Sequence, residues 1–315
     1  MALAEEGSLP QQTSHPPSPT YNNLVLSGGA FKAIAFIGCI RYLEDNNLIS
    51  YIQNVIGSSA GAIIGLMVCL DYSSNDMISI IKKESSQYDD TIDIDSILDM
   101  FDTMGASDGQ EFVEMAYRIM QYKLSCETFS DSEVRSINFA NFAKKTGKNM
   151  VIAASNLSKA QSEYFSVDTT PTLTILQAIR ISISVPIIMT PVIMNDMVYV
   201  DAGIFNNFPI EYFDDQRNPF TNTLSLLVSS PLSNTPVNSL NLISYVKLLF
   251  DSLLTRNNTK HESAGKGNHS VYVDLKEGSQ TYGIDMQTMK MEINDVLIDK
   301  YIEIGYESLK LSYIR

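Results

Sequence analysis

The sequence has few cysteines and few histidines, and both shortages exclude classes of site. Three cysteines stand far apart, at Cys39, Cys69 and Cys126. An odd number of widely spaced cysteines does not form a disulfide framework, and no pair has the spacing of a zinc site. The cysteines therefore predict a chain that folds in a reducing compartment, without a disulfide framework or a paired-cysteine metal site.

Positive charge is also scarce. The chain has 22 Lys and Arg against 36 Asp and Glu, which gives a net charge of −14. The longest basic runs are the pairs Lys82-Lys83 and Lys144-Lys145. A nucleic-acid-binding surface needs a basic stripe, and attraction to anionic lipid needs basic clusters. The composition argues against both, so contact with a membrane would have to be mainly apolar.

Long apolar runs are missing as well. The most apolar stretch, residues 55–70, is interrupted by glycines and serines. A membrane-spanning helix needs about 20 apolar residues, so we interpret this stretch as a strand end followed by a buried helix. The first 20 residues lack the basic start and apolar core of a signal peptide. The predicted location is intracellular and cytoplasmic, with peripheral contact to a membrane surface as an option.

The domain organisation follows from composition along the chain. Residues 1–20 contain four prolines among Gln, Ser and Thr, which predicts a disordered tail. Residues 21–315 contain no internal repeat and no linker, and 44% of the chain is hydrophobic. A length of 315 residues is sufficient for one large core. We therefore expect a single domain over residues 21–315.

Two strand–turn–helix units follow each other near the start of this domain. Residues 24–26 are predicted as a buried strand, followed by a glycine turn and a helix over 31–44. A second strand ends at Ile56 and is followed by a second glycine turn and a helix to Leu70. Successive units of this kind indicate a parallel sheet with crossover helices, so the predicted fold class is α/β.

The remaining elements are predicted from periodicity, caps and turn residues. A threonine followed by proline, Thr170-Pro171, is typical of a helix start. Residues 192–200 are predicted as a hairpin that turns at Asn195-Asp196. The other expected elements are helices at 75–86, 93–104, 109–122, 132–145, 170–184, 240–254 and 287–312, and strands at 148–154, 163–167, 224–228 and 271–275.

The strongest chemical motif is the G-x-S-x-G pattern of residues 57–61. It follows an apolar strand and opens an apolar helix, which is the setting of a nucleophile elbow. Gly57 and Gly61 would let the strand and the helix approach closely around Ser59, whose hydroxyl would project over the sheet edge. The alternative is a turn of small residues that packs a helix on a strand.

A nucleophilic serine needs a site for the oxyanion, and residues 27–30 also lie between a strand and a helix. Backbone N–H groups at the start of a helix suit a developing negative charge. The segment is neither a dinucleotide fingerprint nor a phosphate-binding P-loop. The alternative is an ordinary glycine turn.

The nucleophile also needs a base. His15 lies in the tail, and His261 and His269 lie in a polar stretch that is predicted as a loop. The order Ser, Asp, His would permit a triad that uses one of these two. Asp201 is the better candidate because it directly follows an apolar strand, where active sites of open parallel sheets gather. Turn chemistry is the alternative role for Asp201.

Together these three segments resemble the patatin-like phospholipases. Residues 27–33 are similar to the glycine-rich loop of that family, residues 57–61 to its nucleophile motif, and Asp201-Ala202-Gly203 to its aspartate motif. The stretch 178–209, which includes Pro186, Pro191 and the Asn207-Phe208-Pro209 triplet, falls in the family's order and spacing. The resemblance covers roughly residues 21–212.

The resemblance implies a three-layer α/β/α fold with a central, mostly parallel sheet. It also implies an acyl hydrolase with a Ser–Asp dyad, in which Ser59 is the nucleophile and Asp201 the base. Its expected substrates are glycerophospholipids or other acyl lipids at a membrane surface, without metal or cofactor. The resemblance assigns the oxyanion site to backbone groups of Gly28, Gly29 and Ala30, loop ordering to Lys32, and support of the two motifs to Gly57, Gly61, Ala202 and Gly203.

The chain departs from the family pattern at three small residues. Ala30, Ala33 and Ala202 stand where glycine is usual. Alanine keeps its N–H but does not adopt positive φ cheaply. These departures leave open a catalytically weak or inactive lipid-binding or effector module, besides a His-dependent esterase.

Two further segments permit more than one interpretation. The apolar run 185–194 could line an acyl groove, touch a bilayer or simply belong to the core. The acidic residues between Asp89 and Asp95 could bind calcium or cap a helix.

Overall fold

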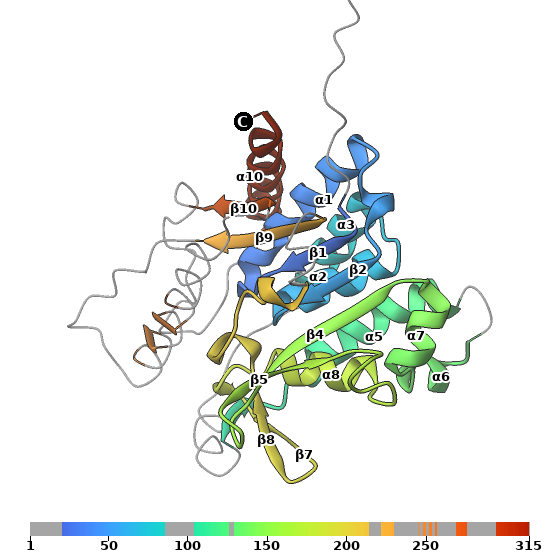
Figure 1. Cartoon of the computed structure of the whole chain (residues 1–315), viewed down its shortest axis with the longest axis vertical. Helices are drawn as coiled ribbons and strands as arrows, with labels where there is room; N and C mark the ends of the chain where they lie inside the picture. Colours follow the sequence, from blue (N-terminus) through green and yellow to red (C-terminus); the bar gives the residue numbers. More distant parts are fainter. Residues whose placement is uncertain are drawn as a thin grey trace, which may run out of the picture.

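The computed structural model describes residues 21–85, 104–125, 129–213, 222–229, 269–275 and 294–314, with six residues between 245 and 256. Within these residues, a mixed eight-stranded sheet runs through the molecule in the order β10-β9-β1-β2-β4-β8-β7, and β5 pairs with β4 beside this path (Figure 1). A short second sheet pairs β3 with β6. The tail 1–20 and, apart from its last residue, the predicted helix 93–104 lie outside the described residues.

The strands and helices have the following bounds. The strands are β1 Asn23–Leu26, β2 Asn54–Gly57, β3 Gly105–Ser107, β4 Asn149–Asn156, β5 Gln161–Phe165, β6 Ile187–Met189, β7 Val192–Met194, β8 Met197–Val200, β9 Thr223–Ser229 and β10 His269–Asp274. The α-helices are α1 Ala35–Asp45, α2 Ala60–Cys69, α3 Ser74–Ser85, α5 Gln110–Leu124, α6 Asp131–Arg135, α7 Phe139–Thr146, α8 Ile175–Ser182 and α10 Asp295–Ile314. The short 3-10 helices are η1 Ala30–Ile34, η2 Ile49–Tyr51, η4 Ala202–Ile204 and η5 Ile210–Phe213.

The strands β10, β9, β1, β2 and β4 are parallel to one another, whereas β5 and β8 pair with β4, and β7 with β8, in antiparallel fashion. The β7–β8 turn has positive φ at Asn195 and Asp196, as a two-residue hairpin turn of this hand requires. The predicted α/β class with a central, mostly parallel sheet and the predicted hairpin are therefore confirmed.

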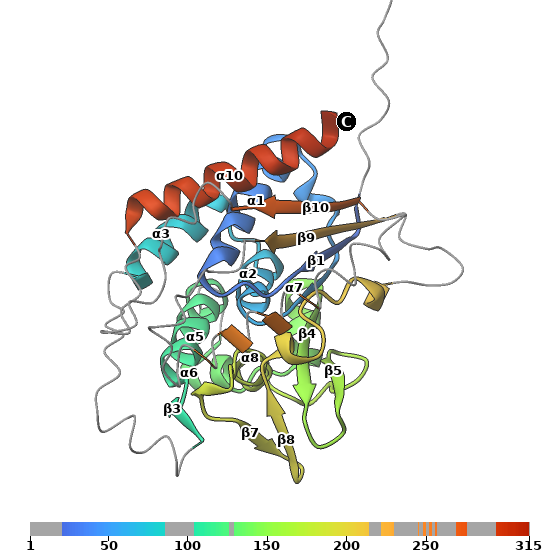
Figure 2. The same ribbon diagram turned by 90° about the vertical axis from the view of Figure 1, so that its left-hand side faces the viewer.

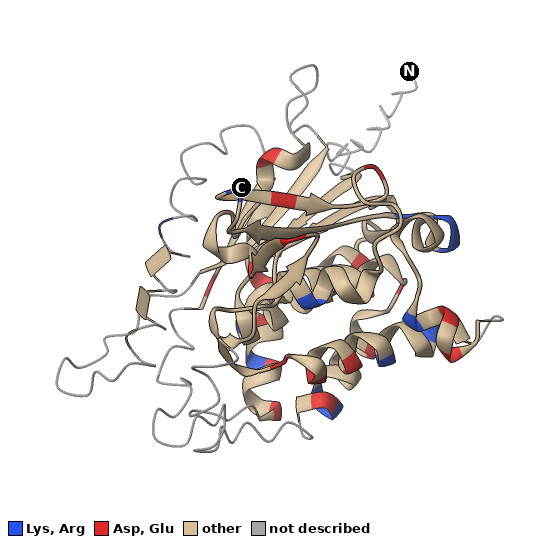
Figure 3. Ribbon diagram, turned by 90° about the horizontal axis from the view of Figure 1, so that it is seen from below, with Lys and Arg blue, Asp and Glu red and all other residues tan. Residues whose placement is uncertain are grey.

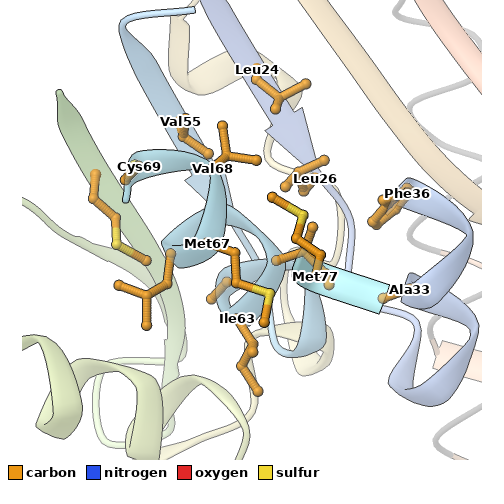
Figure 4. Close-up of a cluster of buried hydrophobic side chains, with 14 of the residues drawn as sticks. Leu24, Leu26, Ala33, Phe36, Val55, Ile63, Met67, Val68, Cys69 and Met77 are labelled. Carbon is orange, nitrogen blue, oxygen red and sulfur yellow. The ribbon is translucent and has the colours of Figure 1, made fainter. Parts of the chain in front are cut away.

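The central strands are buried on both faces. On one face, Leu24 and Leu26 of β1 and Val55 of β2 meet Ile63 and Met67 of α2 in the larger core (Figure 4). On the other face, a smaller cluster is built from alternate strand residues and the segment around η5, and it contains Val25, Ile56, Val151, Phe208, Ile210 and Leu227. The near-continuous apolar strands of the sequence reflect this two-sided burial.

Helix α10 packs directly on α1, although the two helices are about 260 residues apart in the chain. Figure 2 shows α10 lying across the sheet end that carries α1 and β10. A Cβ atom added to Gly38 would lie 1.8 Å from the Ile302 carbonyl oxygen, and one added to Gly305 would lie 1.8 Å from the Ala35 carbonyl oxygen. Glycine is therefore required on both helices for this close approach.

Charged groups are distributed over the helices rather than gathered by sign. Figure 3 shows Lys and Arg interspersed with Asp and Glu along the described helices. Several basic residues are paired with acidic ones, including Arg118 with Glu84 and Arg135 with Glu114. Within the described part of the chain, no helix is both long enough and apolar enough to cross a membrane.

Three sequence-based predictions need correction. The helix expected over 132–145 is two helices, because Asn138 caps a new one by accepting the Asn141 N–H. The helix expected from Thr170 begins at Ile175, because Thr174 provides the cap and accepts the Gln177 N–H. The helix expected over 31–44 opens as the 3-10 helix η1.

The C-terminal predictions are only partly covered. His269, expected in a loop, is the first residue of β10. Most of the predicted helix 240–254 lies outside the described residues, as does the first part of the helix predicted over 287–312.

Candidate active site

The glycine loop and the serine motif lie side by side because β1 and β2 are adjacent and parallel. Leu26 at the end of β1 is in register with Gly57 at the end of β2. The Ser58 N–H donates to the Leu26 carbonyl oxygen at 3.1 Å. A Cβ atom on Gly28 would lie only 3.2 Å from the Ser59 Cβ. The carboxyl edge of the sheet therefore brings the two predicted motifs into contact.

Ser59 occupies a sharp turn between β2 and α2. Its backbone has φ +51° and ψ −126°, a conformation that is strained for a residue with a side chain. A Cβ on Gly57 would lie 2.5 Å from the Ala62 Cα, and one on Gly61 would lie 2.4 Å from the Ser27 carbonyl oxygen. Neither position accepts a side chain. This is the strand–turn–helix geometry that a nucleophile elbow needs.

Asp201 reaches the same edge from the antiparallel strand β8. Strand β4 continues past the end of β2, and its Ser155 pairs with Val200, the last residue of β8. The Asp201 side chain is buried and its Oδ1 accepts the Gly203 N–H at 2.7 Å. Its Oδ2 is buried and has no conventional hydrogen bond within the described residues.

The pKa of Asp201 reflects this burial. Removal from water raises the pKa of the carboxyl group from 3.8 to about 6, while the Ser59 hydroxyl and the Gly203 N–H oppose the rise by stabilising the carboxylate. The Ser59 hydroxyl is thus close enough to interact with the Asp201 carboxylate. A carboxylate with a raised pKa accepts a proton more readily than an exposed one.

Ala202 and Gly203 form the first turn of η4, directly after Asp201. The Ala202 carbonyl oxygen accepts the Ser155 hydroxyl at 3.2 Å. Ala202 is not among the residues with positive φ. Alanine therefore fits this position without backbone strain, and the departure from the family pattern costs nothing here.

The glycine loop is fastened from the other side by Asn207. The Gly28 N–H donates to the Asn207 carbonyl oxygen at 3.1 Å, and Asn207 Nδ2 donates to the Gly28 carbonyl oxygen at 3.1 Å. The Gly28 N–H is therefore already engaged, which argues against its assignment as a free oxyanion donor. For the N–H groups of Gly29 and Ala30, no acceptor is found among the residues that the structure describes.

The conformation of this loop explains the small residues in it. A Cβ on Gly29 would lie 2.2 Å from Val228 Cγ2, so the loop packs tightly against β9. Ala30 has φ +47°, the left-handed region that favours glycine. The Lys32 N–H donates to the Gly29 carbonyl oxygen at 3.0 Å and closes the first turn of η1. The backbone is therefore strained at Ala30, where the family usually has glycine.

An apolar cleft of about 530 Å³ opens beside Ser59. Its walls come from the elbow, η1, α2, α3, α5 and the segment before β6, and they include Ile63, Ile64, Ile81, Phe112, Met115, Ile183 and Met189. The ion pair between Arg118 and Glu84 lies at its rim. The volume and lining are typical of a site for a small, largely apolar ligand.

The apolar run 185–194 divides between several environments. Val185 and Met189 line the cleft. Ile193, on the β7–β8 hairpin, is 67% exposed. The run is therefore not simply core, as one of the sequence interpretations had it.

The structure separates His269 from the serine motif. His269 begins β10 and is in register with Leu224 near the start of β9, so it lies toward the opposite, amino end of the parallel strands. Its Nε2 lies 3.0 Å from the Ser312 hydroxyl, and its Nδ1 contacts the Tyr21 hydroxyl. His15 and His261 lie outside the described residues. A triad through His269 is incompatible with this placement.

A metal site is likewise missing from the ranges that the structure covers, where no group of three or more His, Cys, Asp or Glu side chains could hold an ion. The acidic residues between Asp89 and Asp95, considered above as calcium ligands, fall in the undescribed part.

Two serines lie beside the predicted dyad: sequence reasoning missed Ser182, and it placed Ser184 in the family pattern without a role. The Ser59 N–H donates to the Ser182 hydroxyl at 2.9 Å, and the Asp201 N–H donates to the Ser184 carbonyl oxygen at 2.8 Å. Both serines are fully buried. Their signal in the sequence is two serines that interrupt an otherwise apolar helix end just before Pro186.

Comparison with known proteins identifies the family. A model of the patatin-like phospholipases matches residues 24–214. "Probable lipid hydrolase 463L" of Invertebrate iridescent virus 6 is 32% identical over 192 residues, which are 61% of this chain and 62% of that protein. The similarity therefore spans less than two thirds of the iridescent virus protein.

Two further similarities extend over most of the chain. "Uncharacterized protein R571" of Acanthamoeba polyphaga mimivirus is 26% identical over 314 residues, 91% of this chain and 98% of that protein. The crystal structure of VipD from Legionella pneumophila shares the fold, with a TM-score of 0.54 at 15% identity over 94% of this chain and 67% of that one. Because the family model covers more than half of the sequence and includes the glycine loop, the serine elbow and the aspartate motif, the chain belongs to the patatin-like phospholipase family.

Proposed function

We propose that this protein hydrolyses fatty-acyl esters of glycerophospholipids through an acyl-enzyme on Ser59, with Asp201 as the base. The observation that carries the proposal is the buried Asp201 carboxylate, whose pKa is raised to about 6 beside the hydroxyl of a serine in a strained elbow. Membership of a phospholipase family and similarity to a viral protein named as a probable lipid hydrolase support it.

In the acylation step, the Ser59 oxygen attacks the ester carbonyl carbon while its proton passes to Asp201. Collapse of the tetrahedral intermediate breaks the ester bond, and the departing alcohol of the lysolipid takes the proton from Asp201. Water then attacks the acyl-enzyme, gives its proton to Asp201 and releases the fatty acid, with Ser59 reprotonated. The fixed Gly203 N–H holds the carboxylate in place during these transfers.

The oxyanion would be stabilised by the N–H groups of Gly29 and Ala30. Both lie in the loop that contacts the elbow, and the start of η1 adds the positive end of its backbone dipoles. Loss of one oxyanion donor commonly costs about 3 kcal/mol of transition-state stabilisation. Gly28 serves this site indirectly, because its two hydrogen bonds to Asn207 fix the loop.

The cleft beside Ser59 would receive the acyl chain. Its isoleucine, phenylalanine and methionine side chains offer an apolar wall that begins at the serine. The charged Arg118–Glu84 pair at the rim would stay in contact with water. Phospholipid would thus enter with its ester at Ser59 and its acyl chain along α2, α3 and α5.

The experiment that tests this function compares Ser59→Ala with Ser58→Ala. Ser58 is buried beside the nucleophile, and its hydroxyl makes only a long 3.5 Å contact with the Asn206 carbonyl oxygen. We expect Ser59→Ala to abolish release of fatty acid from mixed phospholipid vesicles and labelling by a fluorophosphonate, while Ser58→Ala keeps most of both. Equal loss in the two variants would contradict the assignment.

The same measurements separate an enzyme from an inactive lipid-binding module. A binding module would bind the vesicles without releasing fatty acid, and the fluorophosphonate would not label it. Mass spectrometry of the products then identifies the ester position, the head group and the chain length that the enzyme prefers.

A further inference from the structure

The last residue of α8 and the two residues after it contact the backbone of both proposed catalytic residues. The Ser182 hydroxyl accepts the Ser59 N–H at 2.9 Å, and two residues later the Ser184 carbonyl oxygen accepts the Asp201 N–H at 2.8 Å. Three consecutive residues, 182–184, therefore bridge the two arms of the site, which arrive from β2 and β8. We call these three residues the α8 brace.

The hydrogen bond from Ser182 acts where the chain is most strained. Ser59 has positive φ, a conformation that is unfavourable for a residue with a side chain and that persists only where its surroundings hold it. Its N–H precedes the first turn of α2 and has no acceptor within that helix. The Ser182 hydroxyl is the partner that satisfies this N–H in the observed conformation. Without it, relaxation of the elbow would move the Ser59 hydroxyl.

The brace is itself fastened by Arg180. The guanidinium donates from Nε to the Asp108 carbonyl oxygen at 2.6 Å and from Nη2 to the Thr190 carbonyl oxygen at 2.9 Å and its hydroxyl at 2.8 Å. Its Nη1 contacts the Ser184 hydroxyl. These bonds connect the end of α8 to the segments that follow β3 and β6, so the brace has a fixed position in the molecule.

The two serines of the brace are turned away from the cleft, and only Ile183 faces it. Ser182 and Ser184 are fully buried, whereas Ile183 between them lines the cleft. Ser182 therefore holds the nucleophile without contact to substrate.

From this geometry we infer that Ser182 is a positioning residue, which keeps the elbow in its strained conformation, and that the α8 brace sets the distance between Ser59 and Asp201. The inference rests on the proposed function, because it assigns a role in that reaction.

The test measures the rate constant of fluorophosphonate labelling of Ser59, together with kcat and KM on phospholipid vesicles, in Ser182→Ala, Ser182→Cys and Ser182→Thr. A small misplacement of a nucleophile costs on the order of 100-fold in rate, so we expect Ser182→Ala to lower the labelling rate and kcat by about 10- to 100-fold with KM within about twofold. Threonine keeps the hydroxyl and is expected to restore most of the rate. If the alanine variant does not fold, the cysteine variant, which fills the space with a weaker acceptor, carries the same test.

Ser166→Ala is the matched control. Ser166 is also buried, and its hydroxyl also accepts backbone N–H groups, those of Asp168 and Thr169, in a turn after β5. We expect this variant to lose at least as much thermal stability as Ser182→Ala, because its hydroxyl accepts two N–H groups, while its labelling rate stays within about twofold of the wild type.

Two results would overturn the inference while the proposed function stands. One is a Ser182→Ala enzyme that is labelled at the wild-type rate. The other is a loss of rate that only follows the fall in melting temperature and that Ser182→Thr does not restore. Failure of the proposed function has a different signature, because the wild-type protein would then show no Ser59-dependent labelling at all.

Discussion

Asn207 and Gly28, 179 residues apart, are joined by a reciprocal pair of hydrogen bonds. Each residue donates one N–H group and accepts one, and both distances are 3.1 Å. The loop that is proposed to stabilise the oxyanion is thus fixed by the segment that follows Asp201. The glycine loop and the segment after the aspartate motif, which are far apart in the sequence, are thus hydrogen-bonded to each other.

We expect Asn207→Ala to impair catalysis more than folding. The substitution removes the side-chain bond to the Gly28 carbonyl oxygen and leaves that buried group unpaired, which costs about 1–3 kcal/mol in stability. The loosened loop should lower kcat at least about 10-fold, since one oxyanion donor is worth about 100-fold or more. Kinetics on purified protein and a urea denaturation curve measure the two effects.

Asn206→Ala provides the control for that prediction. Asn206 lies on the same turn, but its Nδ2 donates to the Tyr164 hydroxyl and to Glu211 and its Oδ1 accepts the Phe208 N–H, so none of the hydrogen bonds that its side chain makes within the described residues reaches the glycine loop. The Asn206→Ala variant should be less stable than the wild type but should keep its kcat. A loss of kcat in Asn206→Ala as large as in Asn207→Ala would show that the whole turn, not the bond to Gly28, matters.

The activity should depend on pH through Asp201. Burial raises the pKa of this carboxyl group to about 6, and the base must be deprotonated to accept the Ser59 proton. We therefore expect kcat/KM to rise about tenfold per pH unit below about pH 6 and to level off above it. A rate profile that is already flat at about pH 5, on vesicles whose own charge does not change, would argue against Asp201 as the base.

Asp201→Asn should be nearly inactive yet more stable than the wild type at about pH 7. Because the folded-state pKa lies above the unfolded value of 3.8, the native protein binds the proton more tightly, and its stability falls as pH rises from about 4 to 6. A difference of about two pKa units corresponds to at most about 3 kcal/mol at neutral pH. The neutral amide avoids this cost.

Denaturation at about pH 7 and at about pH 4 measures that effect. The stability advantage of Asp201→Asn should be present at neutral pH and should shrink in acid, where the wild-type carboxyl group is protonated. If the variant is less stable than the wild type at both pH values, the carboxylate is better stabilised in the fold than its burial indicates.

Ala30→Gly should stabilise the protein without loss of activity. Ala30 has φ +47°, where glycine pays no steric penalty, and its side chain is exposed. Relief of the strain, less the greater chain entropy of glycine, should raise the free energy of unfolding by up to about 1 kcal/mol. Ala33→Gly is the contrasting variant, because Ala33 is buried in η1 and should lose stability. Thermal melts of both variants test this. A higher melting temperature for Ala30→Gly supports backbone strain at Ala30, and an unchanged one contradicts it.

Chelators should leave the rate unchanged within about twofold, because a serine nucleophile with an oxyanion loop needs no Lewis acid. The measurement is vesicle hydrolysis before and after treatment with EDTA. A full loss of activity that calcium restores would redirect attention to the acidic residues between Asp89 and Asp95.

The elements that positioned the site were predictable because their signals are local. The glycines at 57 and 61 and the apolar residues around them indicated an elbow, and parallel strands place their carboxyl ends together. Ser59 could therefore be expected at the carboxyl edge of the sheet. Asp201 reaches the same edge for another reason, because it follows the antiparallel strand β8, whose last residue Val200 pairs with Ser155 beyond the end of β2. The choice between Thr170 and Thr174 as a cap depended on the turn that Thr170 makes with Ser166, which sequence does not reveal.

The remaining errors concern contacts between distant parts of the chain. The sequence does not reveal that the Gly28 N–H has an acceptor. The fold shows that it donates to the Asn207 carbonyl oxygen. In the sequence, Ser182 is an ordinary serine near a helix end. Its hydrogen bond to Ser59, which is 123 residues away, appears only in the folded structure. His269 lies in a polar stretch, which predicts a loop. In the structure this stretch pairs with β9 and is a strand. Long-range pairing, not local propensity, decided each of these positions.

The pairing of β1 with β9 has a consequence for the order of events during synthesis. A ribosome that has made the chain through residue 213 has already supplied Ser59, Asp201 and the whole glycine loop. The strand that flanks β1 is still missing, although the Ser27 N–H needs the Leu226 carbonyl oxygen and Gly29 packs against Val228. Loop closure over about 200 residues is slow, and α10, which packs on α1, is made later still. The nascent protein thus carries both proposed catalytic residues before it has the framework that aligns them, and activity should begin only after β9 and α10 have been made.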